Sequence, residues 1–386
     1  MHDFSITATK LGNLSAAYFY STICLLLPAG QILDRVSTRK VILTALLICI
    51  TGTYCFAFSK VYYIAELSRL FTGIGGAFCF LSCIRFASRW FPNDKLALVS
   101  GLIVTMAMLG GTVAQTPLTL LIHYLGSWRH AVMLDATMGV VFWIIMFVNL
   151  QDYPEANGRM MNKDHVKLGE YGFWKTMRIS YLKLRNWLCG LYTCFMNLPI
   201  YLIGGGGFGS LYLQQVKHFS VLQSSYPPMM IFFGTVFGSP LAGWVSDHMR
   251  LRKLPMQIGA IISIILMFIL ITIPGSLFFY AALFFLLGLI SSAQVISYPT
   301  VAESNPRMIT AMSVSVVSFT TLAGGAVFQP FFGYVMDKMG GVQVINNIHI
   351  YTPQAYHAAM LIMPAAMMVA LLATFFMRET HCKSIE

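Results

Sequence analysis

Charge is scarce in this chain of 386 residues. Only 10% of the residues are Asp, Glu, Lys or Arg and 57% are hydrophobic, whereas soluble globular domains average about a quarter charged residues. This composition excludes a soluble domain. The sequence also lacks a phosphate-binding Gly-Lys-Ser/Thr loop and a nucleophile triad in a polar segment. The His residues show no metal-ligand spacing, and the pair Cys79 and Cys83, four residues apart, has no His or carboxylate near it, so we interpret it as helix packing. We therefore expect no enzyme activity, no catalytic residues, no metal and no cofactor.

What the chain has instead is a succession of apolar runs. A run of roughly 20 residues can cross a hydrocarbon core of ~30 Å as a helix, and helices satisfy their own backbone groups in lipid. The runs are continuous and do not alternate with a period of two, so a β-barrel is not indicated. The sequence predicts an all-α polytopic membrane protein with eleven spans, at about residues 11–33, 41–59, 62–90, 97–123, 130–150, 187–213, 222–247, 255–273, 275–300, 308–336 and 355–377.

The net charge of +11 reflects topology and not nucleic-acid binding. Most of the Lys and Arg residues fall on one side of the predicted membrane, which the positive-inside rule assigns to the cytoplasm. Arg69 lies within a span, and the residues expected on the opposite side are Lys10, Lys60, Arg129, Lys217 and Lys338. The expected surroundings are a lipid bilayer, with no nucleic-acid partner.

A short charged turn between two apolar runs occurs twice. In each copy an Asp lies four residues after a Gly, an Arg lies five residues after that Asp, and a Lys follows at once. We call these copies the first signature turn (residues 30–40) and the second signature turn (residues 243–253).

The repeat extends beyond the turns. Gly110 and Gly324 are 214 residues apart, as are Gln115 and Gln329, against 213 for the turns. Parallel repeats of this kind are typical of transporters built from two homologous halves. The predicted organisation is an N-terminal bundle (1–150), a basic cytoplasmic linker (151–186) and a C-terminal bundle (187–386).

The signature turns resemble the major facilitator superfamily, whose loop between its second and third helices reads roughly G-x-x-x-D-R-x-G-R-K. Here Ser37 replaces the second glycine and Thr38 follows it. The resemblance implies two bundles of six helices, whereas five and six are seen. We therefore expect that the family's first helix is missing, through a misplaced start or a real truncation.

A carboxylate in such a turn can bind backbone N–H groups or an Arg and so latch one conformation. Glu303, which closes a later apolar run, is expected to act in the same way. The predicted latch residues are Gly30, Asp34, Arg35, Arg39, Gly243, Asp247, Arg250, Arg252 and Glu303.

A second motif that resembles the family begins at Arg69. Arg69-x-x-x-Gly73-x-Gly75 resembles the family motif in which a membrane-embedded Arg faces the central cavity. A charge within the bilayer is costly and normally faces protein or water. Glu66 lies three residues earlier and can pair with Arg69. The alternative is that the two lie near the outer surface and only neutralise each other.

Two later spans are interrupted by polar residues, Gly and Pro. Four glycines at 204–207 disfavour a helix, and broken helices in transporters often form substrate sites. The resemblance implies that the family's first, fourth, seventh and tenth helices line a cavity. The predicted substrate-binding and coupling residues are therefore Arg69, Glu66, Asn197, Gly205, Gln294 and Tyr298.

The resemblance implies a secondary active transporter that moves a small hydrophilic solute by alternating access. We expect proton coupling (symport) and a monomer in the bacterial inner membrane. Efflux of a metabolite or siderophore is the alternative to nutrient uptake. A transport-inactive sensor or scaffold that retains the fold is the alternative from another class.

Overall fold

The structure, a computed structural model, describes residues 4, 6–90, 96–152, 173–305, 310–339, 343–345 and 348–383. Helices dominate this part of the chain. They are α1 (Ala8–Arg35), α2 (Thr38–Phe58), α3 (Tyr62–Trp90), α4 (Leu96–Val113), α5 (Thr116–Leu125), α6 (Trp128–Asn149), α7 (Phe173–Leu182), α8 (Leu184–Met196), η3 (Pro199–Gly205), α9 (Phe208–Gln215), η4 (Gln223–Ser225), α10 (Tyr226–Met249), α11 (Lys253–Thr272), α12 (Leu277–Ser291), η5 (Ser292–Ile296), α13 (Ser297–Glu303), α14 (Thr310–Lys338), α15 (Pro353–Met360) and α16 (Ile362–Phe376).

The helices have the length and composition of membrane spans. The 21 residues of α2 extend about 31 Å at 1.5 Å per residue, close to the thickness of a hydrocarbon core. The predicted span 11–33 lies within α1, a helix of 28 residues. The prediction of an all-α polytopic membrane protein is confirmed. Ten described segments are long and apolar enough to cross a membrane: Thr38–Phe58, Tyr62–Cys83, Thr105–Leu125, Trp128–Asn149, Leu184–Gly205, Gln223–Met249, Lys253–Thr272, Leu277–Glu303, Met312–Lys338 and Pro353–Phe376.

Contacts divide the chain into two compact units. The larger unit contains Met1–Asn13, Met108–Leu120 and Trp174–Glu386, and the smaller unit contains Leu14–Ala107 and Leu121–Phe173. The larger unit thus includes the start of α1 and the region around the end of α4. The division into bundles at 1–150 and 187–386 stays a prediction.

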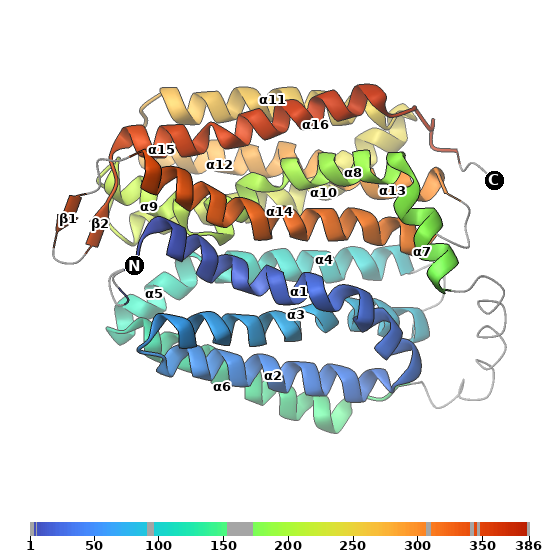
Figure 1. Cartoon of the computed structure of the whole chain (residues 1–386), viewed down its shortest axis with the longest axis horizontal. Helices are drawn as coiled ribbons and strands as arrows, with labels where there is room; N and C mark the ends of the chain where they lie inside the picture. The colour runs from blue at the N-terminus through green and yellow to red at the C-terminus, as the bar shows by residue number, and fades with distance from the viewer. Residues whose placement is uncertain are drawn as a thin grey trace. The chain divides into compact units, whose positions relative to one another are not determined.

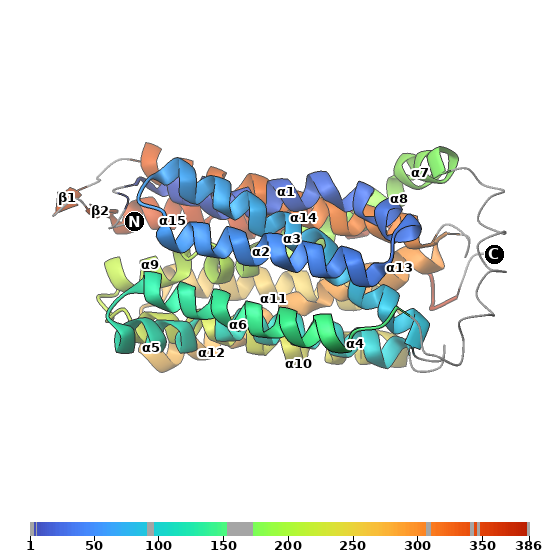
Figure 2. The ribbon, with the colours of Figure 1, turned by 90° about the horizontal axis from the view of Figure 1, so that it is seen from below.

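In the smaller unit, α2 packs against both α3 and α6 (Figure 2). The indole Nε1 of Trp143 on α6 donates to the Leu43 carbonyl of α2 at 2.9 Å. Close approach of α1 to α3 depends on Gly73, where an added Cβ would lie 2.3 Å from the Tyr18 carbonyl oxygen. Small residues at such crossings let membrane helices pack tightly.

In the larger unit, α8 packs against α14 and α16, and α11 lies beside α16 (Figure 1). Its core is fully buried and apolar, and includes Met196, Leu202, Phe208, Met267 and Phe284. Dispersion contacts among such side chains are the main attraction between helices in lipid.

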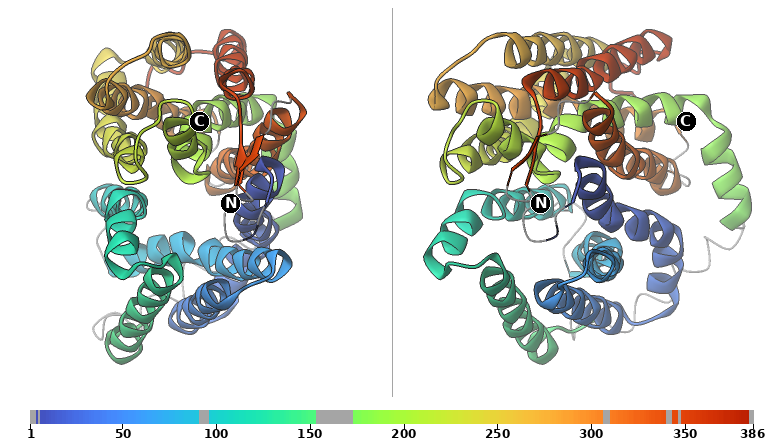
Figure 3. Two further views of the ribbon diagram at one scale, coloured as in Figure 1. Left: turned by 90° about the vertical axis from the view of Figure 1, so that its left-hand side faces the viewer. Right: turned by 60° about the vertical axis from the view of Figure 1, so that its left-hand side comes forward.

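The predicted linker is described only at its two ends. Residues 153–172, with three of its seven Lys and Arg residues (Arg159, Lys163 and Lys167), lie outside the described part. Helix α7 covers part of this linker. It meets α8 at Lys183, whose backbone is extended (φ −79°, ψ 106°), so the two helices bend at this residue (Figure 3).

The predicted helix interruptions are present. After α8 the chain forms a π-helix, η3, and then turns at Gly207, whose φ of +76° favours glycine. Likewise, the 3₁₀-helix η5 separates α12 from α13. Both interruptions fall within candidate membrane spans or at their ends.

Two short features were not anticipated. Strands β1 (Gln343–Ile345) and β2 (Ile348–Ile350) form an antiparallel hairpin, too short for its alternation to stand out in the sequence. The start of α1 is capped by Asp337, whose carboxylate accepts from the backbone N–H of Ala8 at 3.2 Å and of Thr9 at 2.9 Å. A carboxylate suits this position because the first N–H groups of a helix are unsatisfied.

Candidate functional site

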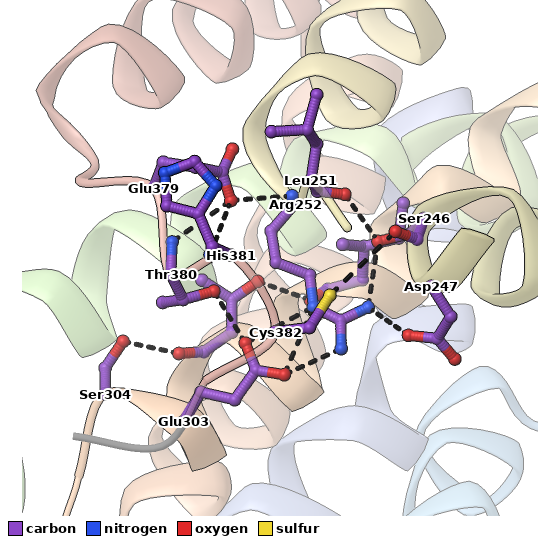
Figure 4. A network of polar contacts seen from close by, with 12 residues as sticks. Ser246, Asp247, Leu251, Arg252, Glu303, Ser304, Glu379, Thr380, His381 and Cys382 are labelled. Atoms are coloured by element: carbon purple, nitrogen blue, oxygen red, sulfur yellow. Dashed lines mark hydrogen bonds and ion pairs between the residues drawn. The ribbon is translucent and has the colours of Figure 1, made fainter. Parts of the chain in front are cut away.

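The second signature turn is built around Arg252, which is only 6% exposed. Its guanidinium donates to Ser246 Oγ at 2.9 Å, Asp247 Oδ1 at 2.6 Å and Glu303 Oε1 at 2.6 Å (Figure 4). Burial alone would lower the pKa of Arg252, but its hydrogen bonds to the carboxylates of Glu303 and Asp247 raise this pKa above its usual value. The guanidinium therefore stays charged and joins the turn to the end of α13.

Glu379 caps the start of α11 in the same network. Its carboxylate accepts from the backbone N–H of Arg252 at 2.7 Å and of Lys253 at 2.8 Å (Figure 4). Burial would raise the pKa of Glu379, but these backbone donors lower it below its usual value. The next residue, Thr380, donates its hydroxyl to Glu303 Oε2 at 2.6 Å. The segment after the last helix thus ties the turn and α13 together.

The first signature turn has an equivalent cap. The carboxylate of Asp152 accepts from the backbone N–H of Arg39 at 2.8 Å and from the Ser37 hydroxyl. Asp152 follows the end of α6 by three residues, as Glu379 follows the end of α16. The Arg39 guanidinium differs from that of Arg252, because it donates to the Phe147 carbonyl at 2.6 Å.

The predicted latch set is only partly assembled. Arg252, Asp247 and Glu303 come together, whereas Arg250 ends α10 as an exposed residue with φ +53°. An added Cβ at Gly243 would meet nothing within 4 Å. The side chains of the remaining predicted members, Gly30, Asp34 and Arg35, lie outside the described part.

Sequence reasoning missed Glu379 and Asp152. The available signal was a carboxylate soon after the last apolar run of each half. That signal can be interpreted only once the last helix of each half, α6 or α16, is known to contact the helix that follows the signature turn, α2 or α11.

Asn197 and Gln294, predicted from two different interrupted helices, form a reciprocal amide pair. Gln294 Nε2 donates to Asn197 Oδ1 at 2.7 Å, and Asn197 Nδ2 donates back to Gln294 Oε1. Each residue is 7% exposed. The pair joins the end of α8 to η5 and satisfies two amides that would be costly to bury alone.

Two more predicted lining residues are described. Gly205 is exposed at the end of η3. Tyr298 is partly buried near the start of α13, which packs against α14. The lining role of both residues stays a prediction.

Arg69 lies in α3, about 10 Å along the helix from Tyr62 at 1.5 Å per residue. Its guanidinium carbon lies 5.8 Å from the centre of the Tyr18 ring. Within the described part of the chain, no carboxylate forms an ion pair with Arg69. Glu66 lies one helical turn after Tyr62 in the same helix. The pairing expected from the spacing of Glu66 and Arg69 is not made in this structure.

Comparisons with known proteins agree with this architecture. Residues 1–314 match the profile of the family described as Major Facilitator Superfamily. The D-galactonate transporter of Escherichia coli O6:H1 is 24% identical over 361 residues, which cover 88% of this chain and 83% of that protein. The probable sulfoacetate transporter SauU of Cupriavidus necator is 22% identical over 368 residues, covering 88% and 81% respectively.

Among solved structures, one of a bacterial homolog of the human lysosomal transporter Spinster, inward-facing and unoccupied, aligns with a TM-score of 0.76. The alignment has 17% identity and covers 97% of this chain and 91% of that chain. At this identity the likeness shows the fold alone.

Proposed function

Because the chain belongs to the major facilitator superfamily, a family of membrane transporters and not enzymes, we propose that it carries a small organic anion by alternating access. We further propose that the transport is uptake coupled to protons, in the inner membrane of a bacterium.

The observation that carries this proposal is the Arg69 guanidinium. It lies within the candidate span Tyr62–Cys83, and none of the described carboxylates neutralises it. A charge at membrane depth normally pairs with a partner or faces water. A planar guanidinium binds carboxylate, sulfonate or phosphate groups through two parallel hydrogen bonds. An anionic solute would supply the negatively charged partner that Arg69 does not find among the described carboxylates.

The relatives support an anionic solute. D-galactonate and sulfoacetate, which appear in their names, differ in size and hydroxyl content but share a negative charge at neutral pH. The shared charge, and not a particular carbon skeleton, is what we extend to this chain.

Proton coupling follows from the energetics of anion uptake. Each negative charge that enters against an inside-negative potential costs ~2.3 kcal/mol per 100 mV. A proton that enters with the anion removes this cost. Glu66 is the carboxyl we assign to this role, since it lies one turn from Arg69 in the same helix.

The remaining predicted residues receive supporting roles. Asn197 and Gln294 would bind hydroxyl groups of the solute after their mutual pair opens. The network around Arg252 and Glu303 would stabilise the turn end of the larger unit through each cycle. We propose that one chain is sufficient for transport.

The test is uptake by purified protein in liposomes, with labelled D-galactonate and sulfoacetate under an inward proton gradient. Arg69→Gln keeps a polar side chain but removes the charge, and we expect uptake to fall about 10- to 100-fold, as for the loss of a charged hydrogen bond. Arg69→Lys keeps the charge without the planar fork and should retain part of the activity. The matched control is Arg178→Gln, since Arg178 is exposed on α7.

Several outcomes would contradict the proposal. Unchanged uptake by Arg69→Gln removes Arg69 from the site. Uptake that does not respond to the proton gradient excludes proton coupling. If folded protein neither transports nor exchanges any organic anion in either direction, the scaffold alternative is favoured, while export alone favours efflux.

A further inference from the structure

Two glutamines hold the same irregular segment of the larger unit. Gln115 Nε2 donates to the Gly204 carbonyl at 3.0 Å, and Gln329 Nε2 donates to the Tyr201 carbonyl at 2.9 Å. Both carbonyls belong to the π-helix η3. Side-chain amides therefore provide donors for a backbone that does not form a regular α-helix.

The segment needs such donors because of its geometry. The chain leaves η3 at Gly205 and reverses direction through Gly207, with φ +76°, before α9 begins. Carbonyls at the end of a helix have no donor from a following turn. At membrane depth, water cannot replace the missing donors. Gly204 is buried, so its carbonyl depends on Gln115.

Gln115 is itself placed by an interruption. It lies between α4 and α5, and its backbone N–H donates to the Thr112 carbonyl at 3.2 Å in a tighter turn than an α-helix makes. The Phe232 ring contacts both segments: an added Cβ would lie 2.6 Å from it at Gly111 and 3.1 Å from it at Gly204. Two helix interruptions thus meet at one aromatic ring and one hydrogen bond.

Gln329 occupies the equivalent position in the repeat, 214 residues after Gln115. It lies in the continuous helix α14, next to Pro330, and is only 1% exposed. Duplicated positions in the two predicted halves therefore converge on one segment from different helices. This arrangement is asymmetric, because the segment they hold belongs to the C-terminal half alone.

We propose that Gln115 and Gln329 form a clamp that positions η3, and that Gln115 is the half of the clamp that releases during transport. Gln329 and η3 lie in the same predicted half, so their bond persists. Gln115 comes from the other predicted half, so its bond to Gly204 breaks when the halves exchange contacts. Both glutamines are positioning residues. The release step rests on the proposed transport function, whereas the clamp does not.

Hydrogen–deuterium exchange of the purified full chain in lipid nanodiscs tests the clamp without any solute. Gln115→Leu removes the donor and keeps a side chain of similar size. We expect exchange across residues 199–207 to accelerate about tenfold, as for the loss of one hydrogen bond. Gln329→Leu should accelerate exchange around Tyr201. The matched control is Gln257→Leu on α11, where the described residues give the Gln257 side chain no hydrogen-bond partner.

Gln115→Glu distinguishes a lost donor from disturbed packing. A carboxyl group donates a hydrogen bond to a carbonyl only when it is protonated. After correction for intrinsic exchange rates, protection of residues 199–207 should therefore return as pH falls through the pKa of the introduced carboxyl. The wild-type chain should show no such transition in this segment. The variant also supplies a measurement if Gln115→Leu does not fold.

The outcomes separate this inference from the proposed function. Unchanged exchange at 199–207 in folded Gln115→Leu overturns the clamp, as does equal acceleration throughout the larger unit. If an anion is transported, release predicts a maximal rate changed at least about fivefold in Gln115→Leu, because the bond contributes to one state of the cycle and not to the other, with KM changed less than about twofold. If exchange shows the clamp but Gln115→Leu leaves the maximal rate unchanged, the proposed release of Gln115 is overturned and the clamp stands. If no anion is transported, the exchange result still decides the clamp.

Discussion

Replacing Arg252 with methionine removes the cation at the centre of the second signature turn and keeps a long side chain. The Glu303 side chain is only 14% exposed, so its carboxylate would remain mostly out of water with the Thr380 hydroxyl as its remaining side-chain donor. Removing one member of a buried ion pair typically costs ~3–5 kcal/mol. We expect Arg252→Met to lower the free energy of unfolding by an amount in that range.

The same guanidinium provides an internal control. The Asp247 side chain lies 2.6 Å from Arg252 Nη1 but is 68% exposed, and exposed ion pairs contribute only ~0–1 kcal/mol. Asp247→Asn should therefore have a small effect despite its short contact. Combining Arg252→Met with Glu303→Gln removes the unpaired charge, so the double variant should be more stable than Arg252→Met alone.

The assay is thermal unfolding of purified protein in one detergent at pH 7, followed by tryptophan fluorescence. A change of 1 kcal/mol shifts the midpoint by roughly 2–4 °C for a unit of this size. The order of the midpoints decides the question, since Arg252→Met should lie well below Asp247→Asn. Equal midpoints for these two variants, or a double variant below Arg252→Met, would refute the reasoning that burial determines the strength of each pair.

Two further predictions concern the larger unit. Backbone donors lower the pKa of Glu379 in the folded protein. The stability that Glu379 contributes is therefore complete above the pKa of an unfolded Glu, about 4.3, and is lost as pH falls through the lower pKa of the folded state. The difference in thermal midpoint between wild type and Glu379→Gln should shrink on acidification below pH 4, and a constant difference would contradict the cap. Asn197→Leu and Gln294→Leu should each lower the free energy of unfolding by ~1–3 kcal/mol, because each leaves the other buried amide without its partner. The double variant should lower it by less than the sum of the two, and strict additivity in a double-mutant cycle would show that the two amides do not interact.

The fold could be predicted from the sequence because its signals are repeated and local. The apolar runs, the two signature turns and the interrupted spans each depend on residues close together in the chain. The glycines at 204–207 predicted an interruption, and the structure places η3 and the turn at Gly207 there. Arg252 and Glu303 were both recognised as latch residues, although they are 51 positions apart.

The partners of individual side chains could not be predicted in the same way. Glu66 can reach Tyr62 four residues before it or Arg69 three residues after it, and spacing does not decide between them. Asn197 and Gln294 were each expected to face a solute, but they are 97 positions apart and bond to each other. Choosing between such contacts requires the packing of helices that are distant in sequence.

The two caps on the signature turns also set an order in time. Each turn is made early in its half, yet the carboxylate that fastens it, Asp152 or Glu379, follows the last helix of that half. During synthesis the N–H groups at the start of α2 and α11 therefore have no carboxylate acceptor until the rest of the half has left the ribosome. Each turn can gain its capping carboxylate only when the last helix of its half has been inserted. A half that is incompletely inserted therefore has an uncapped signature turn.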